Sequence, residues 1–320
     1  MNEALRLLRK LVRRWGYDLK ASDQYLLRPV PHIEDLPHGL DLRAVKIMFD
    51  QDHGPSNGAD LDRLTVYLRT CVRPDRNIDK RPRLTGATDE ENALRCLAST
   101  VTSINDAATD RGTDAIDVVV LDDRSALETL EKFKQVLAPL TCSWQIIRTK
   151  EKGQGPSLHE QFSRARPLKT LIYFCEDDYL HEPVAIRDMW QFYDLIHQAS
   201  GGHCVIYPQE HKNLYEGHYP SYIFAGPTRR WRTMSDATHT FFTHAKVVDT
   251  YWDYFENTKY VGERSKKRHL ATEKVTTNRL YEHIPGFSPI PPVAVHLQFE
   301  ELLPPLFDWR PLWDANKVDL

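Results

Sequence analysis

Three consecutive carboxylates, Glu176, Asp177 and Asp178, follow directly after the apolar run 171–175. A short continuous apolar run is typical of a buried strand, and carboxylates gathered at its end repel one another unless a cation lies among them. Oxygen ligands of this kind suit Mg²⁺ or Mn²⁺, which proteins bind through one or two carboxylates and the phosphates of a substrate. The alternative is a solvated turn, or a cap on the helix that follows Pro183. The position behind a strand favours a metal site.

A second acidic pair, Asp122 and Asp123, follows the apolar run 116–121. At a strand end, Asp122 could accept hydrogen bonds from the base or ribose of a nucleotide. The alternative is helix capping, because Ser125 and Glu128 have the spacing of a capping box that opens the next helix. Capping explains Ser125 better than it explains Asp122.

Other polar residues follow the first and the third apolar runs of the sequence. The run 64–69 leads into Thr70 and Arg73, and Gly153 and Gly155 lie in the loop after a third apolar run. Ligands of an open parallel sheet bind at the carboxyl ends of its strands. A glycine before a helix also lets the backbone approach a phosphate. We therefore expect these loops to converge on one phosphate-bearing ligand.

The elements that must position these residues alternate between strands and helices. That order predicts an α/β fold with a mainly parallel central sheet flanked by helices. The first part contains strands at 64–69, 116–121, 144–148 and 171–175, with helices near 93–104, 125–138 and from Ser157. The second part contains a helix to about 199, a strand at 204–207, possible hairpins in 208–243, helices near 245–257 and 271–283, and a proline-rich tail (285–313) expected to be extended on the surface.

Composition limits the class of protein. The chain has 320 residues, of which 41% are apolar and 27% charged, so it can build a sizeable core. A net charge of −3 gives no basic excess to hold a polyanion, and we expect no nucleic-acid partner. The five cysteines include no CxxC pair, which favours buried free thiols and a cytoplasmic protein. The chain contains no run of 18 apolar residues, so we expect no transmembrane helix.

The N-terminal segment 4–15 has the pattern of an amphipathic helix with a basic face. Such a helix either lies on an anionic membrane surface or packs on its own domain with the basic face in water. The first alternative would make the protein peripheral at the inner membrane surface.

Four segments in this order resemble the family 2 glycosyltransferases with the GT-A fold. They are 64–70, 117–125, 155–161 and 171–178, and the resemblance covers about residues 64–182. It implies that the first strand end and the Asp122–Ser125 segment hold a nucleotide, and that the acidic triplet corresponds to the metal-binding DxD motif. The chain departs from the family pattern in lacking Pro-Thr-Tyr-Asn after the first strand, in Arg124 where the family has glycine, and in Glu176 where it has aspartate.

The resemblance also implies a reaction and its participants. A nucleotide-diphosphate sugar would be the donor, and a glycan or lipid-linked saccharide in surface polysaccharide synthesis would be the acceptor. Asp178 is then the first choice as ligand of Mn²⁺ or Mg²⁺, with Glu176 or Asp177 assisting or meeting the ribose. The sequence-based assignments are, for nucleotide-sugar binding, Thr70, Arg73, Asp122, Asp123, Gly155, Glu176 and Asp177, and for metal binding, Asp178, Glu176 and His296.

An inverting transfer to a hydroxyl group needs a general base, and the candidates are Asp236, Glu263 and Glu273. For each of them an ordinary surface acid is the favoured alternative. His296, within an apolar run, is either a core histidine or the late histidine that completes the metal shell in several GT-A enzymes. His239, like His244 five residues later, could bind sugar hydroxyls or simply pack.

Two other functions use the same features. A nucleotidyltransferase that makes nucleotide sugars would need a glycine-rich basic loop directly after the first strand, where glycine is missing until Gly86. A non-enzymatic carbohydrate-binding module would not need Asp178. We expect three parts of the chain: an extension (1–63), a nucleotide-sugar-binding half (64–182) and an acceptor-binding half with the tail (183–320).

Overall fold

The computed structural model describes residues 60–72, 84–216, 221–261 and 272–319, together with Leu8 and Val12, which are helical. The rest of the N-terminal amphipathic segment lies outside the described residues, as do Arg73 and Glu263. Within the described ranges, no helix combines the length and the apolar character needed to cross a membrane.

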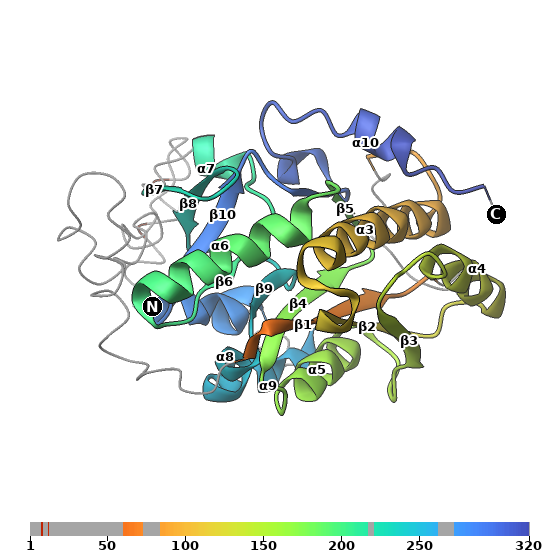
Figure 1. Cartoon of the computed structure of the whole chain (residues 1–320), viewed down its shortest axis with the longest axis horizontal. Coiled ribbons are helices and arrows are strands. Elements are labelled where there is room, and N and C mark those ends of the chain that lie inside the picture. Colours follow the sequence, from red (N-terminus) through yellow and green to blue (C-terminus); the bar gives the residue numbers. More distant parts are fainter. Residues whose placement is uncertain are drawn as a thin grey trace.

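Four parallel strands form the first half of a nine-stranded sheet and carry the acidic clusters at their ends (Figure 1). The apolar runs of the inner strands bury both faces, as parallel strands require, whereas the edge strand at 143–148 is partly exposed. In this register Thr70 lies opposite Asp122, and Arg69 lies opposite Glu176. This parallel half contains, in spatial order, β3 (Ser143–Arg148), β2 (Ile116–Asp122), β1 (Asp60–Thr70) and β4 (Thr170–Glu176).

The sheet continues beyond β4 as a mixed half, in which β9 runs antiparallel to β4. Its order is β9 (Phe241–His244), β6 (Val205–Ile206), β10 (Gly286–Ile290), β8 (Arg230–Met234) and β7 (Ile223–Ala225). The prediction that the proline-rich tail only wraps the surface is therefore wrong, since β10 lies inside the sheet. The tail also supplies β11 (Ala294–His296), which pairs with β5 (Tyr179–His181) in a separate two-stranded sheet.

Helices cover both faces of the large sheet, which confirms the predicted α/β class (Figure 1). One face packs against α3 (Asp89–Arg111), α4 (Leu127–Leu137) and α6 (Ala185–Ser200). The other packs against α5 (Gln154–Ala165), α8 (Ala245–Thr250) and α9 (Trp252–Glu256). The short helices α7 (Asn213–Glu216) and α10 (Arg310–Ala315) lie outside these layers, and Trp313 of α10 belongs to a third apolar cluster with Val295 of β11.

Several helix boundaries differ from the sequence prediction. No side chain caps α4, because the Ser125 hydroxyl instead accepts a hydrogen bond from the Val72 N–H at 2.9 Å. Helix α5 begins three residues before Ser157, whose hydroxyl donates to the Gln154 carbonyl oxygen in the first turn at 3.0 Å. The helix expected near 271–283 is a pair of 3₁₀ turns, η6 (Glu273–Val275) and η7 (Thr277–Glu282). All five cysteines are buried, as predicted, and form no disulfide.

Candidate functional site

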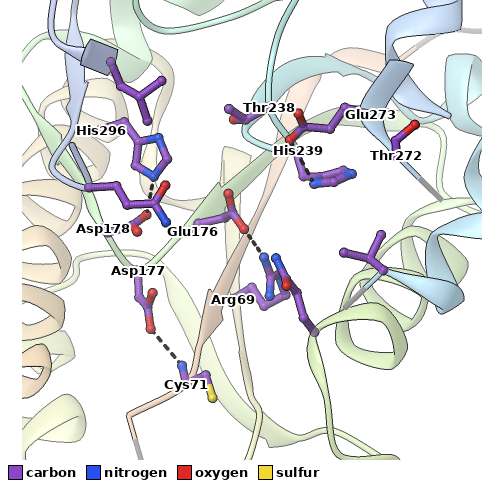
Figure 2. Close-up of a pocket in the computed structure, with 14 residues that line it drawn as sticks. Arg69, Cys71, Glu176, Asp177, Asp178, Thr238, His239, Thr272, Glu273 and His296 are labelled. Carbon is purple, nitrogen blue, oxygen red and sulfur yellow. Dashed lines mark hydrogen bonds and ion pairs between the residues drawn. The ribbon is translucent and has the colours of Figure 1, made fainter. Parts of the chain in front are cut away.

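A cavity of about 500 Å³ opens at the carboxyl ends of β1 and β4 (Figure 2). Its polar lining comes from the parallel half of the sheet and from later segments outside the large sheet. Arg69, Cys71, Glu176, Asp177 and Asp178 come from the parallel half, and Thr238, His239, Thr272, Glu273 and His296 come from later segments. The structure thus brings the acidic triplet together with one predicted base and the predicted histidine.

The three carboxylates of the triplet make three different contacts. Asp177 accepts a hydrogen bond from the Cys71 N–H at 2.8 Å. Glu176 forms an ion pair with Arg69, which is only 7% exposed. Burial raises the pKa of Glu176, and the charge of Arg69 opposes that rise. Asp178 Oδ1 lies 3.3 Å from Nε2 of His296.

The fold fixes His296 from far away in the sequence. It ends β11 and lies opposite Tyr179 in the two-stranded sheet. Its ring stacks on the Tyr179 ring at 4.6 Å with an interplanar angle of 11°, and its backbone N–H donates to Gln209 Oε1 at 2.6 Å. These contacts present Nε2 to Asp178.

The chemistry of this pair fits a divalent cation. Two ligands at right angles around Mg²⁺ or Mn²⁺ have donor atoms roughly 3 Å apart, given metal–ligand distances of about 2.1 Å. The 3.3 Å between Asp178 and His296 is compatible with that spacing. Among the residues that the structure describes, no group of three or more His, Cys, Asp or Glu side chains forms a metal cluster. Glu176 faces Arg69 instead, so Asp178 and His296 are the two described side chains of this cluster that could hold such an ion.

The residues predicted to bind the nucleotide support one another through hydrogen bonds. The hydroxyl of Thr70 donates to Asp122 at 3.2 Å, and the Ser125 N–H donates to the same carboxylate at 3.0 Å. Asp122 is fully buried, and its carboxylate holds the loop through these hydrogen bonds. A direct contact of Asp122 with the base of a nucleotide stays a prediction. Asp123 accepts from the Gly153 N–H at 3.0 Å and so ties this loop to α5. Arg124 has a φ of 62°, the left-handed conformation that favours glycine.

Gly155 has a packing role that the sequence prediction did not foresee. A Cβ atom added there would lie 2.4 Å from the Lys259 carbonyl oxygen and 2.7 Å from that of Val261. The missing side chain therefore lets the 3₁₀ turn η4 (Asn257–Tyr260) approach α5. That close approach explains the glycine without a phosphate ligand.

The two described base candidates differ in position. Glu273 lines the cavity, and burial, together with the nearby charges of Glu176 and Asp236, raises its pKa to about 7. A carboxylate with that pKa is suited to accept a proton at neutral pH. Burial also raises the pKa of Asp236, but this residue accepts a 2.6 Å hydrogen bond from Asn278 and does not belong to the described lining of the cavity.

Sequence reasoning assigned no role to Arg69, although a charged residue inside an apolar strand was an available signal. It also left His239 and His244 undecided, and the structure separates them. His244 packs, because its ring contacts the Lys169 carbonyl oxygen at 2.7 Å and caps α8 through the Lys246 N–H. His239 lies in the cavity wall, with Nδ1 3.6 Å from Glu273 Oε1.

The comparison with solved structures finds distant matches, which are similarities only. S. aureus TarS is 15% identical, with a TM-score of 0.40 over 68% of this chain and 34% of TarS. Residues 1–349 of TarS in complex with UDP-GlcNAc are 13% identical, with a TM-score of 0.38 over 68% of this chain and 54% of that one. A protein described as a nucleotide-diphospho-sugar transferase from Desulfovibrio desulfuricans G20 is 10% identical, with a TM-score of 0.34 over 68% and 76%.

The chain thus matches between about one third and just over half of the length of the TarS chains. No curated protein sequence matches it. The sequence model described as "Glycosyl transferase family 2" matches residues 90–252, which is about half of the chain and includes both acidic clusters. The chain therefore belongs to glycosyl transferase family 2.

Proposed function

We propose that the protein is a metal-dependent glycosyltransferase. It transfers a sugar from a nucleotide-diphosphate donor to a hydroxyl group of a glycan or lipid-linked saccharide, in the synthesis of a surface polysaccharide. One observation carries the proposal: Asp178, His296 and Glu273, far apart in the sequence, line one cavity at the carboxyl ends of parallel strands.

Each of these residues has a role in the proposed reaction. Asp178 and His296 would hold Mn²⁺ or Mg²⁺, and a bound ion of this kind offsets the charge that develops on a leaving diphosphate. Asp177 orders the end of β1 through the Cys71 N–H. Glu273 accepts the proton of the acceptor hydroxyl group, because its raised pKa keeps it basic enough at neutral pH.

Thermal unfolding with a panel of nucleotide sugars tests this proposal. UDP-, GDP-, CMP- and dTDP-linked sugars are added with and without Mn²⁺ to the wild type and to the variants Asp178→Ala and His296→Ala. We expect one nucleotide to raise the melting temperature by a few degrees only with the metal, because ligands that bind the native state stabilise it. Both variants should lose that metal-dependent increase.

His159→Ala is the matched control, since His159 lines a separate cavity with Lys150 and Tyr260 and does not belong to the described lining of the candidate site. This control should respond as the wild type does. A metal-dependent response that survives Asp178→Ala would show that the triplet does not hold the ion. If no nucleotide stabilises the wild type, the chain is better explained as a carbohydrate-binding module.

Attachment to the cytoplasmic side of a membrane is a separate part of the proposal. It depends on the basic face of residues 4–15. Vesicles containing anionic lipid should bind the full chain and release a chain that lacks residues 1–16. Equal binding of both chains would leave the segment without a membrane role.

A further inference from the structure

Two buried polar atoms in the wall of the cavity have no hydrogen-bond partner in the part of the chain that the structure describes. They are Nε of Arg69 and Nε2 of His239. The two side chains are 7% and 4% exposed, so bulk water does not solvate them freely. Buried polar atoms of this kind are normally paired, and leaving them unpaired is unfavourable. Both residues line the same cavity.

The guanidinium group of Arg69 is held in place by its other nitrogen atoms. One nitrogen forms the ion pair with Glu176, and another donates to the hydroxyl oxygen of Ser157 at 3.3 Å. The guanidinium group always carries its proton. Its Nε–H is therefore a fixed hydrogen-bond donor for a group in the cavity.

His239 supplies an acceptor beside this donor. Burial and the charge of Arg69 lower the pKa of His239 to about 3, so its ring is neutral at physiological pH. A neutral imidazole has one donor and one acceptor nitrogen. Because Nδ1 lies 3.6 Å from a carboxylate oxygen of Glu273, the ionised form of Glu273 favours the proton on Nδ1. Nε2 is then the acceptor. In Figure 2, His239 lies between Glu273 above and Arg69 below.

We infer that Arg69 and His239 form a subsite for one hydroxyl group of the donor sugar. A hydroxyl group can accept from Arg69 Nε–H and donate to His239 Nε2 at once. A carboxylate or phosphate at this position would instead be repelled by the lone pair of His239 Nε2 and by the carboxylates of Glu176 and Glu273. This inference rests on the proposed function and adds to it a requirement for a free sugar hydroxyl at one position.

Donor analogues that lack one hydroxyl group test the subsite. The probes are the donor that stabilises the wild type in the nucleotide-sugar panel and its series of monodeoxy sugars, compared by competition binding with Mn²⁺. We expect one deoxy position to weaken binding to the wild type by about 10- to 100-fold, as for a hydrogen bond to a charged group. The variant His239→Phe should bind that analogue and the parent donor about equally. The variant lacks the hydrogen bond to His239 by which the wild type distinguishes the two ligands.

Two further variants separate the two nitrogen atoms of the ring. His239→Gln places an amide near the position of Nε2 and should retain most of the discrimination, whereas His239→Asn places it near Nδ1 and should lose it. His159→Phe, outside the cavity, is the matched control and should discriminate as the wild type does. Circular dichroism and the melting temperature show whether each variant is folded, and the glutamine variant provides the readout if the phenylalanine variant is not.

The inference is overturned if removal of each hydroxyl group weakens binding, relative to the parent donor, by the same factor in the wild type as in folded His239→Phe or His239→Asn. In that case the two atoms bind only water or another part of the protein. The proposed function fails in a different way, through the absence of any nucleotide-sugar binding to the wild type, and the subsite inference then fails with it.

Discussion

The parallel half and the mixed half of the sheet contribute to the same cavity in different ways. In the parallel half, the polar residues follow directly after strands, and the register alone places Arg69 beside Glu176 and Thr70 beside Asp122. In the mixed half and its connections, His239 and Glu273 come from irregular segments that only tertiary packing brings together. Strand order therefore defines the side of the cavity that carries the acidic triplet, and long-range packing defines the opposite side.

The two sides also differ in how firmly their carboxylates are held. Asp122, Asp123 and Asp177 each accept a hydrogen bond from a backbone N–H group of a neighbouring loop. In the part of the chain that the structure describes, the carboxylate of Glu273 approaches His239 Nδ1 at 3.6 Å, and the pKa of Glu273 is raised to about 7. Groups held by such hydrogen bonds suit preorganised binding, while a partly desolvated carboxylate suits proton transfer.

The largest effect should follow from replacement of Glu273, the proposed general base. In Glu273→Gln, we expect kcat to fall by about 10²- to 10⁴-fold, the usual contribution of general-base catalysis. The metal-dependent affinity for the donor should stay within a factor of about three. Glu282→Gln, which alters a surface carboxylate paired with Arg279, is the control and should retain wild-type kcat. A glutamine variant with normal kcat would place the chemistry in the parallel half.

The same contrast explains how much of the fold was predictable. The strands of the parallel half begin and end within a few residues of their predicted limits, because a buried parallel strand is itself an apolar run. Strand β10 was missed, since prolines at 289, 291 and 292 indicate an extended surface segment unless the neighbouring strands are known. The capping boxes failed because Ser125 and Ser157 make hydrogen bonds to other loops and turns.

The site was predictable to a similar degree. The triplet and His296 were both chosen from the sequence, and the structure places Asp178 beside His296. The different contacts of the three carboxylates in the triplet were not predictable, because they depend on Arg69 across the β1–β4 pair. Glu273 could not be distinguished from Asp236 either, since only the folded protein shows that Glu273 lines the cavity and that Asp236 does not belong to its described lining.

The ion pair between Arg69 and Glu176 should be the most important single contact for stability at the donor side. We expect Arg69→Met to lower the free energy of unfolding by about 3 kcal/mol, because it leaves a buried carboxylate without its counter-charge. The double variant Arg69→Met/Glu176→Gln should recover most of this loss. Urea unfolding measures both variants, and equal stability of the single and double variants would mean that the pair is well solvated.

A smaller effect should follow from the close approach of η4 to α5. Gly155→Ala adds a methyl group 2.4 Å from a backbone oxygen, so one element must shift, at a cost of about 1–3 kcal/mol. Ser163→Ala on the same helix is the control and should change stability by less than about 0.5 kcal/mol. If Gly155→Ala lost nucleotide affinity at unchanged stability, the glycine would belong to the ligand site after all.

The pH dependence of activity and of relative stability should both follow the titration of Glu273. Burial, followed by the charges of Glu176 and Asp236, raises its pKa to about 7, so the base is protonated below that pH. We expect kcat/KM to fall about tenfold per pH unit below pH 7. Because the folded protein holds this proton more tightly than the unfolded chain does, stability relative to Glu273→Gln should decrease as the pH rises from about 4.5 to 7. Activity and relative stability must then change in opposite directions around the same pKa. An activity profile with a different midpoint would assign the base to another group.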